Sequence, residues 1–240
     1  MSKLSVLRKQ NISIEVLHPL NDHISNHYYN NSFYDEATLN KIKDLNVKGT
    51  YVDVGAHIGN HSLFYKLFCN SDKVISIEGN TLNYNYLITN IKQNNLNENI
   101  ISYNNIIDEY DDIEKKIGYS TLYNNNSGCS LVIENDSNIN NYNYIQINKT
   151  KKLDTILKNE TNITLIKLDI EGYEYQALQG CRKTIEKYHP IIVIELHTES
   201  INGKSNIDCA TNKYEKDIRF FLEEYNYKIH YKKDCDYIFI

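Results

Sequence analysis

The sequence predicts an α/β fold in a single domain that spans residues 1–240. Short apolar runs typical of buried strands alternate along the chain with stretches whose apolar residues recur at helical spacing. A glycine turn follows one of these strands directly, as is common where a parallel sheet binds a ligand. With 240 residues, 41% of them hydrophobic, the chain is long enough to bury one substantial core.

The first half predicts strands and helices in regular alternation. Residues 12–17 alternate with period two, as in a strand, and residues 35–45 place their apolar side chains on one helical face. The elements that follow are a strand over 50–54, a helix over 62–68, a strand over 73–77, a helix over 82–93 and a strand within 99–107. Residues 1–48 thus form an N-terminal extension ahead of the regular alternation.

Residues 108–150 form a polar, asparagine-rich insertion. The apolar pieces at 130–133 and 144–147 favour an ordered, β-rich insertion over a disordered linker. Regular alternation then returns with a strand over 163–169, a helix over 175–188, a strand over 190–196, a helix over 213–225 and two short strands over 227–231 and 237–240.

Composition excludes several classes of protein. The formal charge of −5, the pI near 5.9 and the lack of a basic block argue against a nucleic-acid partner. No apolar run approaches the length of a membrane span, and the first residues have no secretory leader, so we expect neither membrane insertion nor secretion. The five cysteines are scattered without metal-binding spacing, which indicates free thiols in the reducing cytoplasm and no structural zinc.

The sharpest motif is Val52-Asp53-Val54-Gly55-Ala56-His57-Ile58-Gly59-Asn60, a strand that enters a glycine turn and then a helix. One strand later, Glu78 stands at a strand's carboxyl end, where a carboxylate can accept both hydrogen bonds of a ribose diol. These features indicate a cofactor that contains a nucleoside, either NAD or S-adenosylmethionine.

The spacing of the motif favours S-adenosylmethionine. In the dinucleotide pattern Gly-x-Gly-x-x-Gly, His57 and Asn60 would replace the second and third glycines, so a pyrophosphate would meet side chains. The methionine amine of S-adenosylmethionine is cationic and suits the acidic Asp53. The structural alternatives are that Asp53 caps a turn and that Glu78 is a solvated strand end.

The chain resembles the FkbM-type S-adenosylmethionine-dependent methyltransferases. The resemblance covers roughly residues 40–200, and its most specific block is Lys167-Leu168-Asp169-Ile170-Glu171-Gly172-Tyr173-Glu174. The other matching segments are 52–59, 77–80, 153–157, 178–180 and 190–195. The chain departs from the family pattern at Ile77-Glu78-Gly79-Asn80, which lacks the usual aromatic residue before the acid and the usual proline after it.

The resemblance implies a Rossmann-like class I methyltransferase fold, with a seven-stranded, mostly parallel sheet and an antiparallel last strand. It also implies a cofactor site. Asp53, Gly55 and Gly59 would line the methionine end together with Ala56, and Glu78 would hold the ribose. His57 would lie near the methionine carboxylate if it is not structural, and Asp108 would lie near the adenine. For His61 we expect a structural role.

Four residues are candidates for catalysis at the acceptor side: Asp169, Glu171, Glu195 and His197. A hydroxyl acceptor loses a proton during methyl transfer, so a base near the methyl group assists the reaction. Asp169 and Glu171 can converge on a hydroxyl or on Mg²⁺, an ion that prefers oxygen ligands. Glu171 can equally cap the following helix, His197 can equally be a surface residue, and Lys167 can be only an ion-pair partner.

The leading hypothesis is O-methylation of a hydroxyl on a sugar, a glycan or a related polyhydroxylated small molecule. The resemblance supplies this substrate class, and the tyrosines and asparagines of the insertion suit a carbohydrate. Two alternatives stay open, namely methylation of nucleic acid or protein, and a non-catalytic protein that keeps the fold as a binding scaffold.

Overall fold

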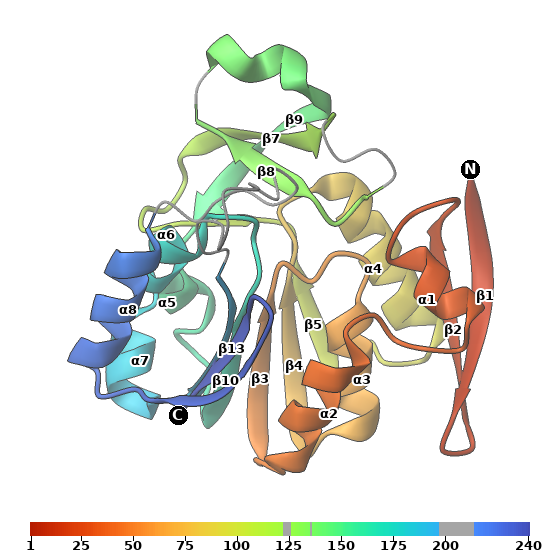
Figure 1. Ribbon diagram of the computed structural model, residues 1–240, viewed down its shortest axis with the longest axis horizontal. Coiled ribbons are helices and arrows are strands. Elements are labelled where there is room, and N and C mark those ends of the chain that lie inside the picture. The colour runs from red at the N-terminus through yellow and green to blue at the C-terminus, as the bar shows by residue number, and fades with distance from the viewer. Residues whose placement is uncertain (122–125, 135, 197–213) are drawn as a thin grey trace.

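The computed structural model describes residues 1–121, 126–134, 136–196 and 214–240 (Figure 1). Its centre is a seven-stranded sheet in the order β12-β13-β11-β10-β3-β4-β5. The bounds of these strands are β3 Gly49–Val54, β4 Ser71–Ile77, β5 Ile100–Tyr103, β10 Ile163–Leu168, β11 Ile191–Glu195, β12 Ile229–Lys233 and β13 Asp236–Phe239. Strands β3, β4, β5, β10 and β11 are parallel, and β13 pairs with β11 antiparallel, so the predicted class I methyltransferase sheet is confirmed.

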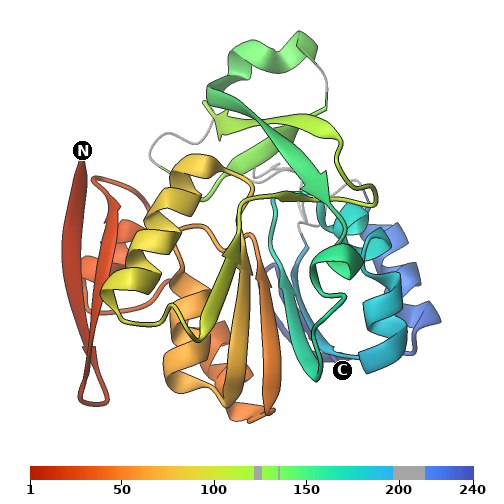
Figure 2. The same cartoon turned by 180° about the vertical axis from the view of Figure 1, so that it is seen from behind.

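Helices cover both faces of this sheet, as Figures 1 and 2 show from opposite sides. One face packs on the group α5 Leu153–Ile156, α6 Glu174–Gln179, α7 Arg182–Tyr188 and α8 Glu215–Glu224. The other face packs on α1 Ser25–Tyr29, α2 Glu36–Asp44, α3 Asn60–Phe68 and α4 Thr81–Gln93. Alternate residues of β3 pack on opposite faces of the sheet. Val52 and Val54 contact the core under the first group of helices, and Tyr51 contacts the core under the second.

The N-terminal segment forms a β-hairpin of β1 Ser2–Lys9 and β2 Ile12–Pro19. The hairpin is fixed to α4, where Asn90 accepts a hydrogen bond from the Leu17 N–H at 2.7 Å and donates one back to the Leu17 carbonyl at 3.0 Å. Strand β2 was predicted and β1 was not. Strand β1 buries Ser5 and Leu7 while exposing Leu4 and Val6, so its apolar residues do not mark a single buried face.

The insertion builds a second sheet above the carboxyl ends of the central strands (Figure 1). It has the order β6-β9-β7-β8 and comprises β6 Ile106–Ile107, β7 Glu114–Ser120, β8 Ser130–Ile133 and β9 Tyr142–Lys151, with the short 3₁₀ helix η1 Asp136–Asn141. The predicted β-rich insertion is therefore confirmed, although β7 was missed because its sequence is mostly polar. The organisation into one domain with boundaries at 48, 108 and 150 stays a prediction.

The predicted helix over 175–188 is interrupted. Helix α6 ends at Gln179, and α7 begins at Arg182 after Gly180 and Cys181. A Cβ on Gly180 would lie 2.2 Å from the carbonyl oxygen of Asp108, so only glycine allows this close approach of the two chain segments.

Two further findings bear on composition. Among the described helices, none combines the length and the apolar content that crossing a bilayer requires. In the described part of the chain, Cys69, Cys129, Cys181 and Cys235 are all free thiols.

Candidate functional site

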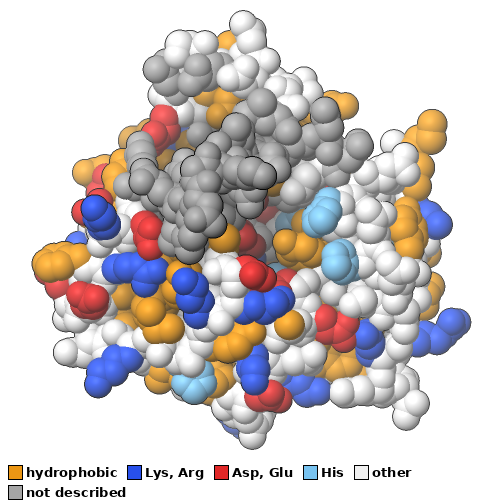
Figure 3. Space-filling model, viewed as in Figure 1, with side chains coloured by type: hydrophobic (Ala, Val, Ile, Leu, Met, Phe, Trp, Pro, Cys, Tyr) orange, Lys and Arg blue, Asp and Glu red, His pale blue; other side chains and the backbone are white. Residues whose placement is uncertain are grey.

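A cavity of about 450 Å³ opens at the carboxyl ends of β3, β4, β10 and β11, beneath the second sheet. This is the edge at which open α/β sheets bind their ligands. The N-terminal segment 24–38 and the β12–β13 turn complete its wall. Figure 3 shows histidine side chains close together on the face viewed, where acidic side chains are interspersed with lysines and arginines.

The turn after β3 is shaped by glycine. Gly55 has φ +78°, and a Cβ there would lie 1.8 Å from the carbonyl oxygen of Asp169. The N–H groups of Gly55 and Ala56 both donate to the Ile77 carbonyl, which holds the turn against β4. Gly59, at φ +101°, precedes the first turn of α3. The turn therefore brings backbone, without intervening side chains, to the floor of the cavity.

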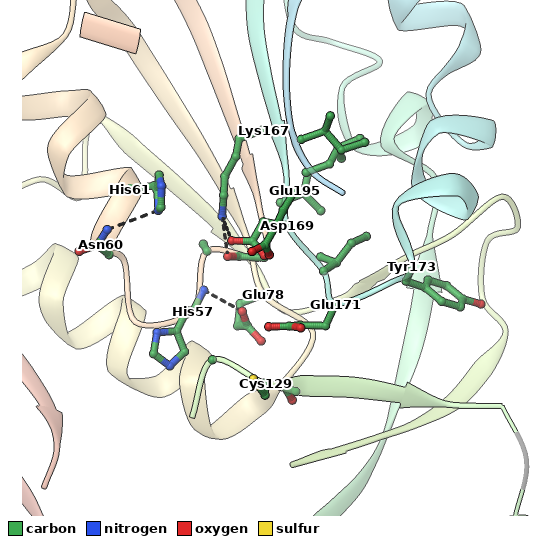
Figure 4. Close-up of a pocket in the computed structure, with 18 of the residues that line it drawn as sticks. His57, Asn60, His61, Glu78, Cys129, Lys167, Asp169, Glu171, Tyr173 and Glu195 are labelled. Atoms are coloured by element: carbon green, nitrogen blue, oxygen red, sulfur yellow. Dashed lines mark hydrogen bonds and ion pairs between the residues drawn. The ribbon is translucent and has the colours of Figure 1, made fainter. Parts of the chain in front are cut away.

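Glu78 lies on one side of the cavity with its carboxylate held by the backbone. It accepts hydrogen bonds from the N–H of His57 at 2.8 Å and from the N–H of Asn80 at 2.7 Å (Figure 4). Burial raises the pKa of Glu78 to about 7, against the lowering effect of these two hydrogen bonds. Each oxygen keeps a further lone pair, so the carboxylate can accept two more hydrogen bonds from a ligand.

Beyond Glu78 the cavity becomes apolar. Ile106, Ile117 and Tyr173 form a small cluster there, with Val132 and Ile170 packed against it. Gly79 forms one wall, since a Cβ on it would lie 3.1 Å from Ile117 and 3.3 Å from Ile106. An apolar slot next to a carboxylate that can accept two hydrogen bonds fits an adenosine group.

Behind the glycine turn, a buried lysine joins two carboxylates. Lys167 lies directly opposite Asp53 in the pairing of β10 with β3. Its ammonium lies 3.4 Å from Asp53 and 3.1 Å from Asp169, and it donates to the Gly55 carbonyl at 3.2 Å. Although burial opposes the charged forms, the ion pair holds the pKa of Asp169 well below its usual range and raises the pKa of Lys167. Asp169 is therefore ionised at neutral pH.

Three carboxylates meet at the end of the cavity formed by the carboxyl ends of β10 and β11. Oxygen atoms of Asp169, Glu171 and Glu195 all lie within 4.8 Å of one another. Asp236 lies on the same wall, and burial together with Asp35 and Asp169 raises its pKa to about 7. This end therefore holds both an ionised carboxylate and a carboxyl group that exchanges its proton near neutral pH.

The structure brings most of the predicted residues into the cavity and leaves others out. Those that line it are Gly55, Ala56, His57, Glu78, Asp169, Glu171 and Glu195. Asp53, Gly59 and Asp108 do not line it. His197 lies outside the described residues.

Two of the three residues that do not line the cavity have partners within the protein, and their contacts with a cofactor stay predictions. Asp53 is fully buried, accepts a hydrogen bond from Ser62 and lies 3.4 Å from the ammonium of Lys167, which it shares with Asp169. Asp108 accepts a hydrogen bond from the Tyr173 hydroxyl at 2.8 Å and pairs with Lys115 at 3.1 Å. It thus links the insertion to the loop after β10 behind the apolar slot.

The sequence did not indicate several residues of the cavity. Asp35 and Asp236 belong to segments without a motif, and only the folded chain brings them together. For Lys167 only an ion pair was expected, and the register of β10 against β3 places it between two carboxylates, those of Asp53 and Asp169. Ile117 comes from the unpredicted strand β7. Of these residues, only Lys167 had a signal in the sequence. It stands within an apolar strand, two residues before Asp169, as is typical of a buried ion pair.

Comparison with known proteins agrees with this geometry. The family described as "Methyltransferase FkbM domain" matches residues 53–229. No curated protein matches the chain. Among solved structures, the methyltransferase FkbM from Methylobacillus flagellatus KT is similar to 89% of this chain at 19% identity, with a TM-score of 0.57. This chain covers 50% of that protein, so it spans half of its length.

A second solved structure is M. capricolum TrmK in complex with S-adenosyl-homocysteine, similar to 85% of this chain at 14% identity, with 66% of TrmK covered and a TM-score of 0.48. At such identities the likeness to solved structures concerns the fold alone. The family match shows more than the fold, because it covers residues 53–229, which are most of the chain. The protein therefore belongs to the FkbM domain family of S-adenosylmethionine-dependent methyltransferases.

Proposed function

We propose that the protein transfers the methyl group of S-adenosylmethionine to a hydroxyl of a sugar, a glycan or a related polyhydroxylated small molecule. The observation that carries the proposal is the single cavity that joins Glu78 and the apolar slot to the carboxylates of Asp169, Glu171 and Glu195. A cofactor and an acceptor can lie end to end in such a space.

The residues of the cofactor end fit S-adenosylmethionine. The Glu78 carboxylate would accept the ribose hydroxyls, while Ile106, Ile117 and Tyr173 would enclose the adenine. The bound cofactor supplies a methyl group already activated by its sulfonium. The protein has then to align the acceptor, exclude water and receive the acceptor's proton.

The acceptor end offers groups for that proton. Asp169 is ionised, so it can accept a hydrogen bond from the acceptor hydroxyl and orient it. Asp236, whose pKa is about 7, is matched to receive a proton at neutral pH. Glu171 and Glu195 provide further hydrogen-bond acceptors for a polyhydroxylated molecule.

The groups suited to a sugar come from an unexpected part of the chain. The tyrosines and asparagines of the insertion were expected to bind it, and of these Asn126 lines the cavity, while Ile117 and Val132 lie at the apolar slot. The N-terminal segment also contributes His27, Tyr34 and Asp35 to the cavity wall. These supply the aromatic rings and polar groups that hold sugars.

The carboxylates also suit a divalent ion, because Mg²⁺ prefers hard oxygen ligands such as those of Asp169, Glu171 and Glu195. Lys167 already neutralises one side of Asp169. If Mg²⁺ binds here, these three residues would hold it and it would polarise the acceptor hydroxyl. Activity measured with EDTA and with added Mg²⁺ decides whether the ion takes part.

The test is transfer of labelled methyl from S-adenosylmethionine to a panel of nucleotide sugars, glycans, simple polyols and matched amines. We expect a hydroxylated acceptor to be methylated and Asp169→Asn to lower kcat by at least a hundredfold. Asp44→Asn removes an exposed carboxylate on α2 and serves as the control that keeps full activity. Turnover of amines alone would refute the O-methyl assignment.

We further propose a cytoplasmic protein without a nucleic-acid partner, in keeping with its acidic charge and free thiols. A salt-dependent affinity for RNA or DNA, measured by filter binding, would contradict this and favour methylation of nucleic acid. Tight cofactor binding without turnover of any acceptor would favour a non-catalytic binding protein.

A further inference from the structure

A strap in the insertion borders the cofactor end of the cavity. It comprises residues 126–130, the last of which begins β8, and it lines the cavity with Asn126, Gly128, Cys129 and Ser130. A Cβ on Gly128 would lie 3.0 Å from the side chain of Ile24, so the strap packs directly on the N-terminal segment. Figure 4 shows Cys129 on the insertion side of the cavity.

Ser127 fastens the strap to three other parts of the chain. Its N–H donates to the Asp22 carboxylate at 2.6 Å, and its carbonyl accepts a hydrogen bond from the Asn83 side chain at 3.0 Å. Its hydroxyl lies 2.8 Å from Nε2 of His57. Asp22 belongs to the N-terminal extension, Asn83 to α4 and His57 to the glycine turn. All three polar groups of Ser127 thus bind residues outside the insertion, and this set of contacts is the Ser127 clasp.

The strap is also tied to the carboxylate assigned to the ribose. His57 and Asn80 are the two residues whose backbone N–H groups hold Glu78. Their side chains reach the strap. The His57 ring contacts the Ser127 hydroxyl, and the Asn80 side chain donates to the hydroxyl of Ser130 at 2.8 Å. A strap held by these two residues therefore lies next to Glu78.

The cofactor end is the more enclosed end of the cavity. Glu78, Ile106 and Ile117 are buried there, whereas the side chain of Asp169 at the acceptor end is 29% exposed. Ile106 and Ile117 stand on strands, which backbone ladders hold in place. The strap is instead a loop held largely by side chains, so it is the wall of this end that opens at the lowest cost.

We propose that the strap is a cover on the cofactor end, which the Ser127 clasp holds shut, and that S-adenosylmethionine enters and S-adenosylhomocysteine leaves past it. This inference rests on the proposed function, which places the cofactor at Glu78. Opening the cover breaks the hydrogen bonds of the clasp, and these must break for entry as well as for release. The clasp therefore controls the rate of cofactor exchange more than the affinity.

Asp22 is the arm of the clasp that comes from outside the matched family domain. It is buried, and its second oxygen accepts hydrogen bonds from the N–H groups of Ile24 and Ser25 at 3.1 and 3.3 Å. The first oxygen is thus held toward Ser127, and a hydrogen bond to a charged group is stronger than one between neutral groups. The N-terminal extension thereby takes part in holding the cover.

The first test measures opening of the strap through the thiol of Cys129. This residue is 3% exposed, so iodoacetamide should reach its thiol only in molecules whose strap is open. Where reclosing is faster than alkylation, the labelling rate follows the population of the open form. We expect Ser127→Ala, which removes one hydrogen bond, to raise that rate about fivefold, and Asp22→Asn to raise it at least as much. Mass spectrometry of the labelled peptides gives the rate for each cysteine.

Two controls separate opening of the strap from general loosening. Cys181 is 1% exposed at the start of α7, and its labelling rate should stay within about twofold of wild type in both strap variants. Ser32→Ala removes another half-buried serine hydroxyl, one that bonds to Glu36 and does not line the cavity, and should leave Cys129 at the wild-type rate. Equal acceleration at both cysteines, or unchanged labelling of Cys129, would overturn the inference. Ser127→Ala decides alone if Asp22→Asn does not fold.

The second test measures cofactor exchange by surface plasmon resonance, with S-adenosylhomocysteine flowing over the immobilised full chain. Ser127→Ala should raise the association and dissociation rate constants together, each about fivefold, and leave the affinity within about twofold. A raised dissociation rate with an unchanged association rate would overturn the inference, because Ser127 would then support the bound cofactor without controlling its entry. A wild type that binds no S-adenosylhomocysteine refutes the proposed function, whereas unchanged labelling of Cys129 refutes the cover, so the two failures are distinguishable.

Discussion

Cofactor affinity should depend on pH through Glu78, and Glu78→Gln should remove that dependence. The buried Glu78 carboxyl has a pKa of about 7 in the empty cavity, raised mainly by burial. Ribose hydroxyls donate stronger hydrogen bonds to its ionised form than to its protonated form, in which one oxygen carries the proton. Binding therefore favours release of the proton, and affinity should fall as the pH drops below about 7.

The size of the effect follows from this pKa. If the bound form titrates near the ordinary value of 4.5, the affinity between pH 8 and pH 5.5 should change by about 30-fold. The same shift predicts that the empty protein loses stability as pH rises from about 4.5 to about 7, because the folded carboxyl holds its proton more tightly than the unfolded one. Glu78→Gln should weaken binding at pH 8 by about 1.5–3 kcal/mol.

The assay is titration of 5′-methylthioadenosine, which keeps the ribose but lacks the titratable amino-acid arm, at half-unit steps from pH 5.5 to pH 8. Wild type should show the slope and Glu78→Gln a flat line. A flat wild-type profile, or a slope that survives in Glu78→Gln, would refute the assignment of Glu78 to the ribose. If the slope survives in Glu78→Gln, Asp236, which also titrates near pH 7, is the group to examine next.

Three further substitutions test the geometry of the site. Lys167→Met leaves Asp53 and Asp169 buried without their cation and should cost about 3–5 kcal/mol in urea unfolding, whereas a loss under 1 kcal/mol would contradict the ion pair. Gly55→Ala places a Cβ 1.8 Å from the carbonyl oxygen of Asp169 at φ +78°, so we expect a much lower Tm and no cofactor binding, and wild-type values would show that the turn can move. Ile117→Ala should weaken S-adenosylhomocysteine and 5′-methylthioadenosine equally, by several-fold, and an effect on only one would remove Ile117 from the adenine slot.

The parts of the site that the sequence predicted are local ones. Gly55 and Glu78 each stand directly after an apolar strand, and the carboxyl ends of parallel strands meet at one edge of the sheet. Asp169 follows β10 in the same way, and Glu195 is the last residue of β11. The pattern of apolar strands was therefore enough to place these four residues at one edge of the sheet.

What the sequence could not predict depends on contacts between distant segments. Asp53 has the right position to meet a cationic amine, but the strand register places Lys167 opposite it. Asp108 stands at the end of its strand, yet the Tyr173 hydroxyl and Lys115 occupy its carboxylate. Neither partner has a fixed spacing from the acid that it neutralises, so no pattern in the sequence reports the pairing.

The most direct test of the cofactor assignment is titration calorimetry of the wild-type chain with S-adenosylhomocysteine, with NAD as the comparison ligand and Glu78→Ala as the control variant. We predict binding of one S-adenosylhomocysteine per chain, no binding of NAD, and a loss of about 1.5–3 kcal/mol in Glu78→Ala. Binding of NAD in place of S-adenosylhomocysteine, or binding of neither ligand, would contradict the assignment of the cavity to S-adenosylmethionine.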